Sequence, residues 1–123
     1  MAYLRTDVGA NLREIPMAQI IWHKQAIKEL ARHLEYASKE FGKATVLRWK
    51  REIADFEENV RKYPNLYTPE QLLTDKPVLY RRRHLMKQRF KLIYYYVEDC
   101  DTVHVVDIWD TRMSPKALVL RIK

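Results

Sequence analysis

Cysteine is nearly absent from this 123-residue chain, and glycine is almost as rare. The single cysteine, Cys100, cannot form an internal disulfide, and with no other cysteine in the chain it gives no support to a metal site. With only two glycines, the chain does not resemble a flexible or low-complexity polymer. The four histidines are scattered along the sequence, so we predict no metal site and no cofactor.

Long apolar runs are missing as well. The longest ones fall far short of the roughly 18 to 20 residues that a membrane-spanning helix needs. No basic segment followed by an apolar one opens the chain as a signal sequence would. We therefore expect a cytoplasmic protein with no membrane partner.

Positive charge and apolar side chains are what the chain has in quantity. A hydrophobic content of 47% is enough for one core, and 123 residues is the usual size of one domain. The formal net charge of +7 predicts attraction to something acidic. Nucleic acid, an acidic protein and an anionic membrane all fit that charge, so charge alone does not choose among them.

The first half of the chain has the pattern of one strand and two helices. Residues 1–16 show no sustained period and are predicted to be an irregular extension before a single domain over residues 17–123. Residues 18–23 form a short apolar stretch typical of a buried strand. Helical spacing then predicts two core stripes, one of Ile27, Leu30, Leu34, Ala37 and Phe41 and one of Val46, Trp49, Ile53, Phe56, Val60 and Tyr63. Gly42 and Pro64 end these helices, which should pack as an antiparallel hairpin.

The second half has the pattern of three antiparallel strands. A proline-containing connector, with one helical turn near residues 70–73, leads to strands over residues 78–85, 89–98 and 102–110. Residues 98–101 have the composition of a tight turn. Residues 103–109 are apolar except at His104 and Asp107, which predicts a central strand covered on both faces. We therefore predict an α+β fold of order β-α-α-β-β-β, with the helices on one face of the sheet.

The first two of these strands are rich in cations. Because side chains two residues apart share a face of a strand, Arg81 projects with Arg83, and Arg89 projects with Lys91. We expect strand pairing to gather these four on one face, while the opposite face of the second strand packs on the helices through Phe90, Leu92, Tyr94 and Tyr96. Like charges on adjacent strands repel each other, so an anionic partner such as a phosphate backbone would stabilise this face. The alternative is an ordinary solvated sheet face.

The order of elements and several short segments together resemble the RelE/ParE superfamily of toxins from type II toxin-antitoxin modules. The segments are KYPN after the second helix, YRRR with KQRFKLIYYYVED across the hairpin, and VVDIWDTRMSPKAL at the end. The resemblance runs from residue 17 to about residue 118. It implies a toxin whose partner is an acidic antitoxin encoded next to it, and no cofactor.

One branch of the superfamily consists of ribosome-dependent endonucleases, which cut mRNA without a metal through attack of a ribose 2′-hydroxyl on the adjacent phosphate. From the resemblance we expect this chain to act on translation as an RNA-binding toxin of this branch. For this branch the resemblance implies catalytic roles for Arg81, Arg83, Lys91 and Arg112, with Lys87, Arg89 and Tyr95 as nucleic-acid-binding residues. The branch usually carries a tyrosine or histidine near the position of Leu118, and a leucine cannot transfer a proton. Tyr95 or His84 would then have to take that role.

Two other interpretations stay open. ParE-like members inhibit DNA gyrase and are not nucleases, and their long helical hairpin is similar to residues 25–63. The chain could also be a basic module that an antitoxin binds and that has lost its toxin activity. Arg112 could form an ordinary turn with Asp110, and Trp49 and Trp109 are predicted to lie in the core because both stand on apolar stripes.

Overall fold

The computed structural model of the protein describes residues 17–122, so the predicted extension over residues 1–16 lies outside the described residues. The first half forms a short strand and two helices, β1 (Gln19–Trp22), α1 (Lys24–Phe41) and α2 (Lys43–Lys62). The second half contains a 3-10 helix η1 (Gln71–Leu73), strands β2 (Arg81–Leu85) and β3 (Phe90–Val97), a second 3-10 helix η2 (Glu98–Cys100), strand β4 (Thr102–Asp110) and helix α3 (Pro115–Arg121). The predicted α+β fold and its element order are confirmed.

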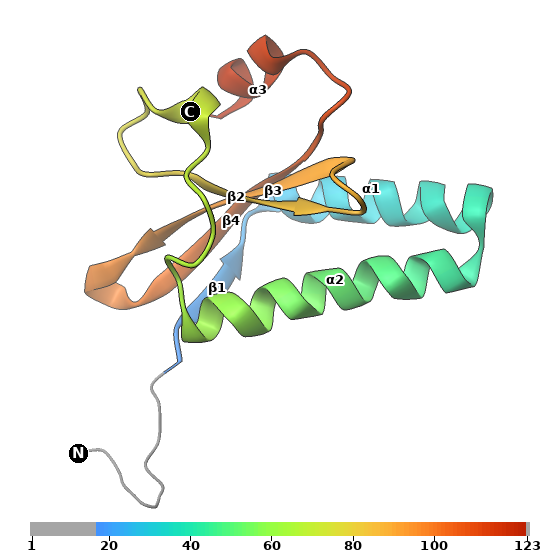
Figure 1. Ribbon diagram of the computed structural model, residues 1–123, viewed down its shortest axis with the longest axis horizontal. Helices are drawn as coiled ribbons and strands as arrows, with labels where there is room; N and C mark the ends of the chain where they lie inside the picture. The colour runs from blue at the N-terminus through green and yellow to red at the C-terminus, as the bar shows by residue number, and fades with distance from the viewer. Residues whose placement is uncertain (1–16, 123) are drawn as a thin grey trace, which may run out of the picture.

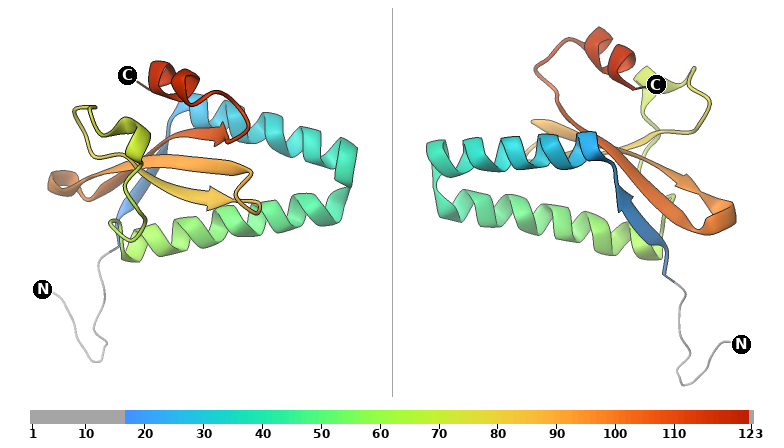
Figure 2. Two further views of the ribbon diagram at one scale, coloured as in Figure 1. Left: turned by 45° about the horizontal axis from the view of Figure 1, so that its top comes forward. Right: turned by 180° about the vertical axis from the view of Figure 1, so that it is seen from behind.

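The four strands form one mixed sheet in the order β1-β4-β3-β2. β1 pairs with β4 in parallel, while β3 is antiparallel to both of its neighbours. β4 is therefore a central strand, as predicted. Figures 1 and 2 show α1 and α2 as a long hairpin on one side of the sheet and α3 on the other side. No helix within residues 17–122 combines the length and the apolar character needed to cross a bilayer.

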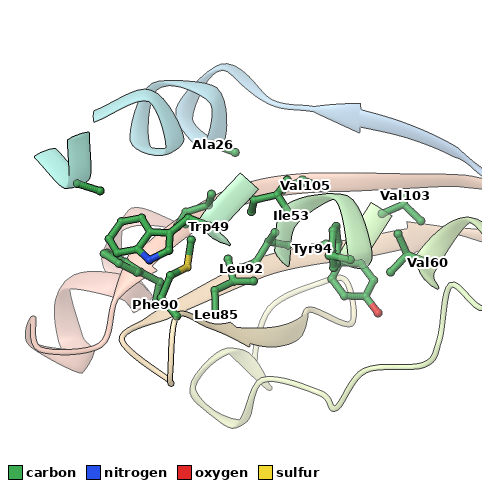
Figure 3. Packing of buried hydrophobic residues seen from close by; sticks show 14 of the residues in the cluster. Ala26, Trp49, Ile53, Val60, Leu85, Phe90, Leu92, Tyr94, Val103 and Val105 are labelled. Carbon is green, nitrogen blue, oxygen red and sulfur yellow. The ribbon is translucent and has the colours of Figure 1, made fainter. Parts of the chain in front are cut away.

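The main core lies between the helical hairpin and the sheet (Figure 3). Trp49 and Phe56 from α2 meet Phe90, Leu92 and Tyr94 from β3, and the Phe56 and Tyr94 rings lie edge to face with centroids 5.4 Å apart. The predicted inward face of β3 is confirmed, and so is the burial of Trp49. Burying such side chains stabilises the fold by roughly 1.5 to 3 kcal/mol each.

The predicted helical stripes were wrong at their margins. Ile27, Phe41 and Tyr63 are exposed, although each stands at a core spacing. The predicted Ala37 is buried, and the predicted Leu30 and Leu34 pack against the main core. The other buried positions of α1 are Ala26, Glu29 and His33, which the stripe did not include. The face of α1 that meets the sheet therefore includes the polar residues Glu29 and His33 beside the apolar stripe.

A second, smaller core lies on the other face of the sheet. It contains Leu73, Tyr80, Ile93, Trp109, Leu118 and Ile122, so it packs α3 and η1 on β3 and β4. Burial of Trp109 here confirms its predicted core position. The α3 helix was not predicted, because seven residues are too few to show a repeating apolar stripe.

One ion pair fixes α3 to the sheet. Asp107 is fully buried, and Arg121 donates to its two carboxylate oxygens at 2.7 and 2.8 Å. The pairing of β3 with β4 shifts between Ile93 and Tyr94, which matches an irregularity in β4. As a result the consecutive residues Val106 and Asp107 both lie on the α3 side, where Val106 packs against the smaller core and Asp107 bonds Arg121. The irregularity turns Asp107 towards α3.

Candidate functional site

The cations of β2 and β3 do not gather on one face of the sheet. The register pairs Arg81 with Tyr94, Arg83 with Leu92 and His84 with Lys91. Residues directly opposite each other in an antiparallel pair share a face. Arg81 and Arg83 therefore lie on the helix side of the sheet, and Lys91 lies on the α3 side. The predicted gathering of these residues was wrong.

The prediction failed because it did not include the register between β2 and β3. Alternation shows which residues of one strand share a face, but the register across the turn decides how the faces of two strands correspond. A shift of one residue in that register exchanges the faces of every side chain. The turn between β2 and β3 consists of four residues, 86–89, and it sets Leu85 opposite Phe90. Arg89 precedes β3 and lies outside the sheet.

Arg81 and Arg83 are engaged by the helix side of the fold. The Arg81 guanidinium donates to the backbone carbonyl of Tyr67 at 2.8 Å. The Arg83 guanidinium donates to the carbonyl of Glu52 on α2 at 2.8 Å and lies 5.7 Å from the centre of the Tyr67 ring. Both side chains therefore connect the edge strand β2 to neighbouring segments.

Lys91 is engaged on the opposite face. Its ammonium lies 2.9 Å from a carboxylate oxygen of Glu70, a residue that is only 3% exposed. Burial alone would raise the pKa of Glu70, but the Leu72 backbone N–H and the Lys91 ammonium together lower it below its usual value. Lys91 thus neutralises a buried carboxylate next to η1. Arg121 neutralises the buried Asp107 in the same way. We call these four paired side chains the inner cations: Arg81, Arg83, Lys91 and Arg121.

The residues considered for proton transfer do not lie on the helix side of the sheet with Arg81 and Arg83. Leu118 is buried in the smaller core. Tyr95 lies on the α3 side, where its ring stacks on His104 with centroids 4.8 Å apart and an interplanar angle of 9°. His84 is the strand partner of Lys91, and burial together with the charges of Arg82 and Lys91 lowers its pKa.

The turn between β2 and β3 has an unusual backbone. Met86, Lys87 and Gln88 have φ angles of 50°, 56° and 69°, a left-handed conformation that is costly for any residue with a side chain. Three contacts hold it. The Met86 backbone N–H donates to a Glu52 carboxylate oxygen at 3.0 Å. The single hydroxyl hydrogen of Thr111 is shared between the carbonyls of Gln88 and Arg89, each 2.9 Å from the hydroxyl oxygen.

Two hollows flank this turn, and Arg89 lines both. The first, of about 390 Å³, lies between α1 and the end of β4 and is lined by Arg32, His33, Glu35, Tyr36, Lys39, Arg89, Asp110 and Arg112. The second, of about 400 Å³, lies between the tip of the helical hairpin and the turn and is lined by Phe41, Thr45, Arg48, Trp49, Glu52, Met86, Lys87 and Arg89. Figure 1 shows the turn beside the helices, with the tip of the hairpin projecting past it.

We call the six cations of the two hollows the outer basic surface: Arg32, Lys39, Arg48, Lys87, Arg89 and Arg112. Arg112 donates to Asp110 at 2.8 and 3.1 Å, as the turn interpretation of Arg112 predicted. This guanidinium lowers the pKa of the Asp110 carboxyl. Burial and the charge of Arg32 lower the pKa of His33, which favours the neutral form of this histidine in the first hollow.

The structure thus brings three predicted site residues together, Lys87, Arg89 and Arg112, and separates them from Arg81, Arg83, Lys91 and Tyr95. Sequence reasoning missed the helical members of the outer basic surface, namely Arg32, Lys39 and Arg48, and it missed Tyr36, which lines the first hollow. Their signal in the sequence is weak, because charged residues on the outer face of a helix are common. Within residues 17–122, no three His, Cys, Asp or Glu side chains gather as a metal ion would require.

Comparisons with known proteins identify the family. The fold is similar to that of a solved chain described as "Chromosomal ParDE TA system from P. aeruginosa", with a TM-score of 0.59 and 14% sequence identity over 76% of this chain and 96% of that chain. A likeness at this identity shows the fold alone. Residues 20–115 match the family described as "ParE toxin of type II toxin-antitoxin system, parDE". The chain therefore belongs to the ParE toxin family, within the RelE/ParE superfamily. A search of curated proteins returned no match.

Proposed function

We propose that the protein is a toxin that inhibits DNA gyrase by binding to it, does not cut RNA, and is held inactive by a cognate antitoxin. Its membership of the parDE toxin family supports the pairing with an antitoxin. The net charge of +7 favours an acidic antitoxin, because complementary charge speeds association and selects the partner. Because the two genes of such modules usually lie side by side, we expect the antitoxin to be encoded next to the toxin.

The observation that carries the proposal is the division of the inner cations between the two faces of the sheet. Cleavage of RNA by attack of a 2′-hydroxyl requires several cations directed at one phosphate, where negative charge develops in the transition state. Arg81 and Arg83 lie on one face and Lys91 on the other, and each is already bound to an oxygen of the protein. This arrangement favours a toxin that acts by binding.

Two further features support the same proposal. The position expected for a proton-transferring residue is taken by Leu118, which is buried against the sheet. The helical hairpin consists of helices of 18 and 20 residues, the long form that is typical of the gyrase-directed branch. A long, rigid hairpin is well suited to contacting another protein.

The experiment compares two targets with the same purified chain. We expect the protein to inhibit supercoiling of plasmid DNA by gyrase and to leave mRNA intact on translating ribosomes. The cognate antitoxin, added first, should restore supercoiling. Cleavage of the mRNA together with normal supercoiling would contradict the proposal and favour the endonuclease branch.

Growth of cells that produce the chain separates a working toxin from an inactive basic module. We expect growth arrest when the chain is produced alone and recovery when the neighbouring gene product is produced with it. Normal growth, with the chain present in folded form, would favour the inactive module.

A further inference from the structure

Among the described residues, the Arg89 side chain has no hydrogen-bond or carboxylate partner. Its Nε atom is buried and makes no hydrogen bond to any residue in 17–122, and no carboxylate of this part of the chain pairs with the side chain within 4 Å. The guanidinium carbon lies 5.8 Å from the centre of the Tyr36 ring and 5.5 Å from that of Phe90. The two rings orient this cation. The Arg89 side chain as a whole is half-buried and lines both hollows, so a ligand can reach the part of the guanidinium that faces them.

The backbone that presents Arg89 is strained. Each left-handed residue that is not glycine costs about 1 to 2 kcal/mol, and three of them precede Arg89. The Thr111 backbone N–H and hydroxyl both donate to the Arg89 carbonyl at 2.9 Å, which holds the residue between the two hollows. Strain maintained by such contacts is common at binding sites, because it fixes a side chain that would otherwise move.

The charges around Arg89 select an anion. Six cations line the two hollows, against the three carboxylates of Glu35, Glu52 and Asp110. Each carboxylate has a protein partner: Lys39 lies 3.6 Å from Glu35, the Met86 backbone N–H bonds Glu52, and Arg112 bonds Asp110. Arg32 is paired as well, with Glu29. Among the described residues, Arg48, Lys87 and Arg89 are the cations of this surface that have no carboxylate partner, so their charge acts on whatever enters the hollows.

The outer basic surface also has two exposed aromatic rings beside its cations, which distinguishes it from a surface that carries charge alone. Tyr36 is 47% exposed and Phe41 is 51% exposed, and their ring centroids are 6.1 Å apart. Tyr36 lines one hollow and Phe41 the other. Neighbouring cations and aromatic faces are the combination that binds single-stranded nucleic acid, whose bases stack on the rings while its phosphates meet the cations.

We propose that the outer basic surface, together with Tyr36 and Phe41, binds a single-stranded nucleic acid across both hollows, with Arg89 on a phosphate. Two hollows that share Arg89 suit an extended strand better than one small anion. An acidic peptide would use the cations, but it would gain little from the ring faces. The biological setting rests on the proposed function, since a toxin that acts on gyrase meets DNA at its target.

The test measures binding of fluorescent 12-nucleotide single strands to the full chain by polarisation, with gyrase absent. Arg89→Ala should weaken binding at least tenfold and lower the salt dependence by about one phosphate contact. Arg89→Lys keeps the charge but loses the planar fork, so it should bind with intermediate affinity. Replacing Tyr36 and Phe41 together by leucine should weaken binding about tenfold. Lys62→Ala removes an exposed cation at the other end of α2 and should change binding less than twofold.

DNA and RNA strands are compared to identify the natural ligand, and polyglutamate of equal charge serves as the peptide control. Equal binding of polyglutamate, or unchanged binding by Arg89→Ala in a variant with wild-type circular dichroism, would overturn the proposal. The supercoiling assay keeps the two proposals apart. Gyrase inhibition without strand binding would overturn only this inference, and strand binding without gyrase inhibition would overturn only the proposed function.

Discussion

The inner cations and the outer basic surface consist of the same kinds of side chain but differ in what these side chains contact. Lys91 lies against the buried Glu70, while Arg89, two residues earlier, lies between two aromatic rings with no acidic partner among the described residues. The first arrangement satisfies a charge inside the fold. The second leaves a charge for a ligand.

This difference shows why a cluster of cations in the sequence is a poor guide to a binding surface. The segment from Arg81 to Lys91 holds six Lys and Arg residues, and the structure distributes them over two faces and one turn. Those in the strands mainly stabilise the fold, because a partly buried cation next to a carbonyl or carboxylate must stay paired. We therefore expect changes in the two groups to have different consequences.

The largest effect is expected at Arg121. Replacing Arg121 by methionine leaves the carboxylate of Asp107 fully buried with no close cation, which should lower the free energy of unfolding by about 3 to 4 kcal/mol in urea titrations. Replacing Asp107 by leucine in the same chain removes that charge and should recover much of the loss. If Arg121→Met alone were as stable as the wild type, the ion pair would not be what holds α3 on the sheet.

A smaller effect is expected at Arg83. Arg83→Met removes the hydrogen bond to the Glu52 carbonyl and the contact with Tyr67, so the free energy of unfolding should fall by about 1 to 2 kcal/mol. Arg51→Met, an exposed position on α2, is the matched control and should change it by less than about 0.5 kcal/mol. Equal effects of the two variants would mean that Arg83 is a surface charge like Arg51.

The pH dependence of stability should reveal the buried Glu70. Its pKa is lower in the folded chain than in the unfolded one, so its contribution is present above the unfolded value and is lost as pH falls through the folded value. Urea midpoints should therefore fall as the solution is acidified below the usual carboxyl range. Glu70→Gln should flatten that part of the curve, and an unchanged slope would contradict the assignment.

The smallest effect should be a gain in stability. Gln88→Gly removes the strain of a left-handed residue at φ 69° but increases the entropy of the unfolded chain, so a net gain of about 0.5 to 1 kcal/mol is expected. The Gln88 side chain is exposed and its backbone contacts remain. Thermal unfolding measures the change, and a loss of stability would show that the turn is not strained at this position.

Much of the fold could be predicted from the sequence, because the helices and β4 have strong local patterns. The buried Trp49 and the covered central strand follow directly from periodicity and from apolar runs. Local patterns do not contain the register across the β2–β3 turn, so the faces of Arg81 and Arg83 could not be obtained from alternation alone.

The candidate site was predicted less well than the fold. Lys87, Arg89 and Arg112 were identified as site residues, but their neighbours Tyr36 and Phe41 come from α1 and become neighbours only through tertiary packing. Phe41 was assigned to the core because its spacing fits the helical stripe. Spacing does not show that the tip of the hairpin extends past the sheet, as Figure 2 does, and leaves this ring exposed.

The most direct test of the division between the two groups of cations is a matched pair, Lys91→Met and Arg89→Met, measured for unfolding and for strand binding. Lys91→Met should lower the free energy of unfolding by about 2 to 3 kcal/mol, because Glu70 stays buried without its closest cation. Arg89→Met should change it by less than about 1 kcal/mol and should lose most binding of single-stranded DNA. Equal losses of stability in the two variants, with strand binding retained by Arg89→Met, would contradict the account.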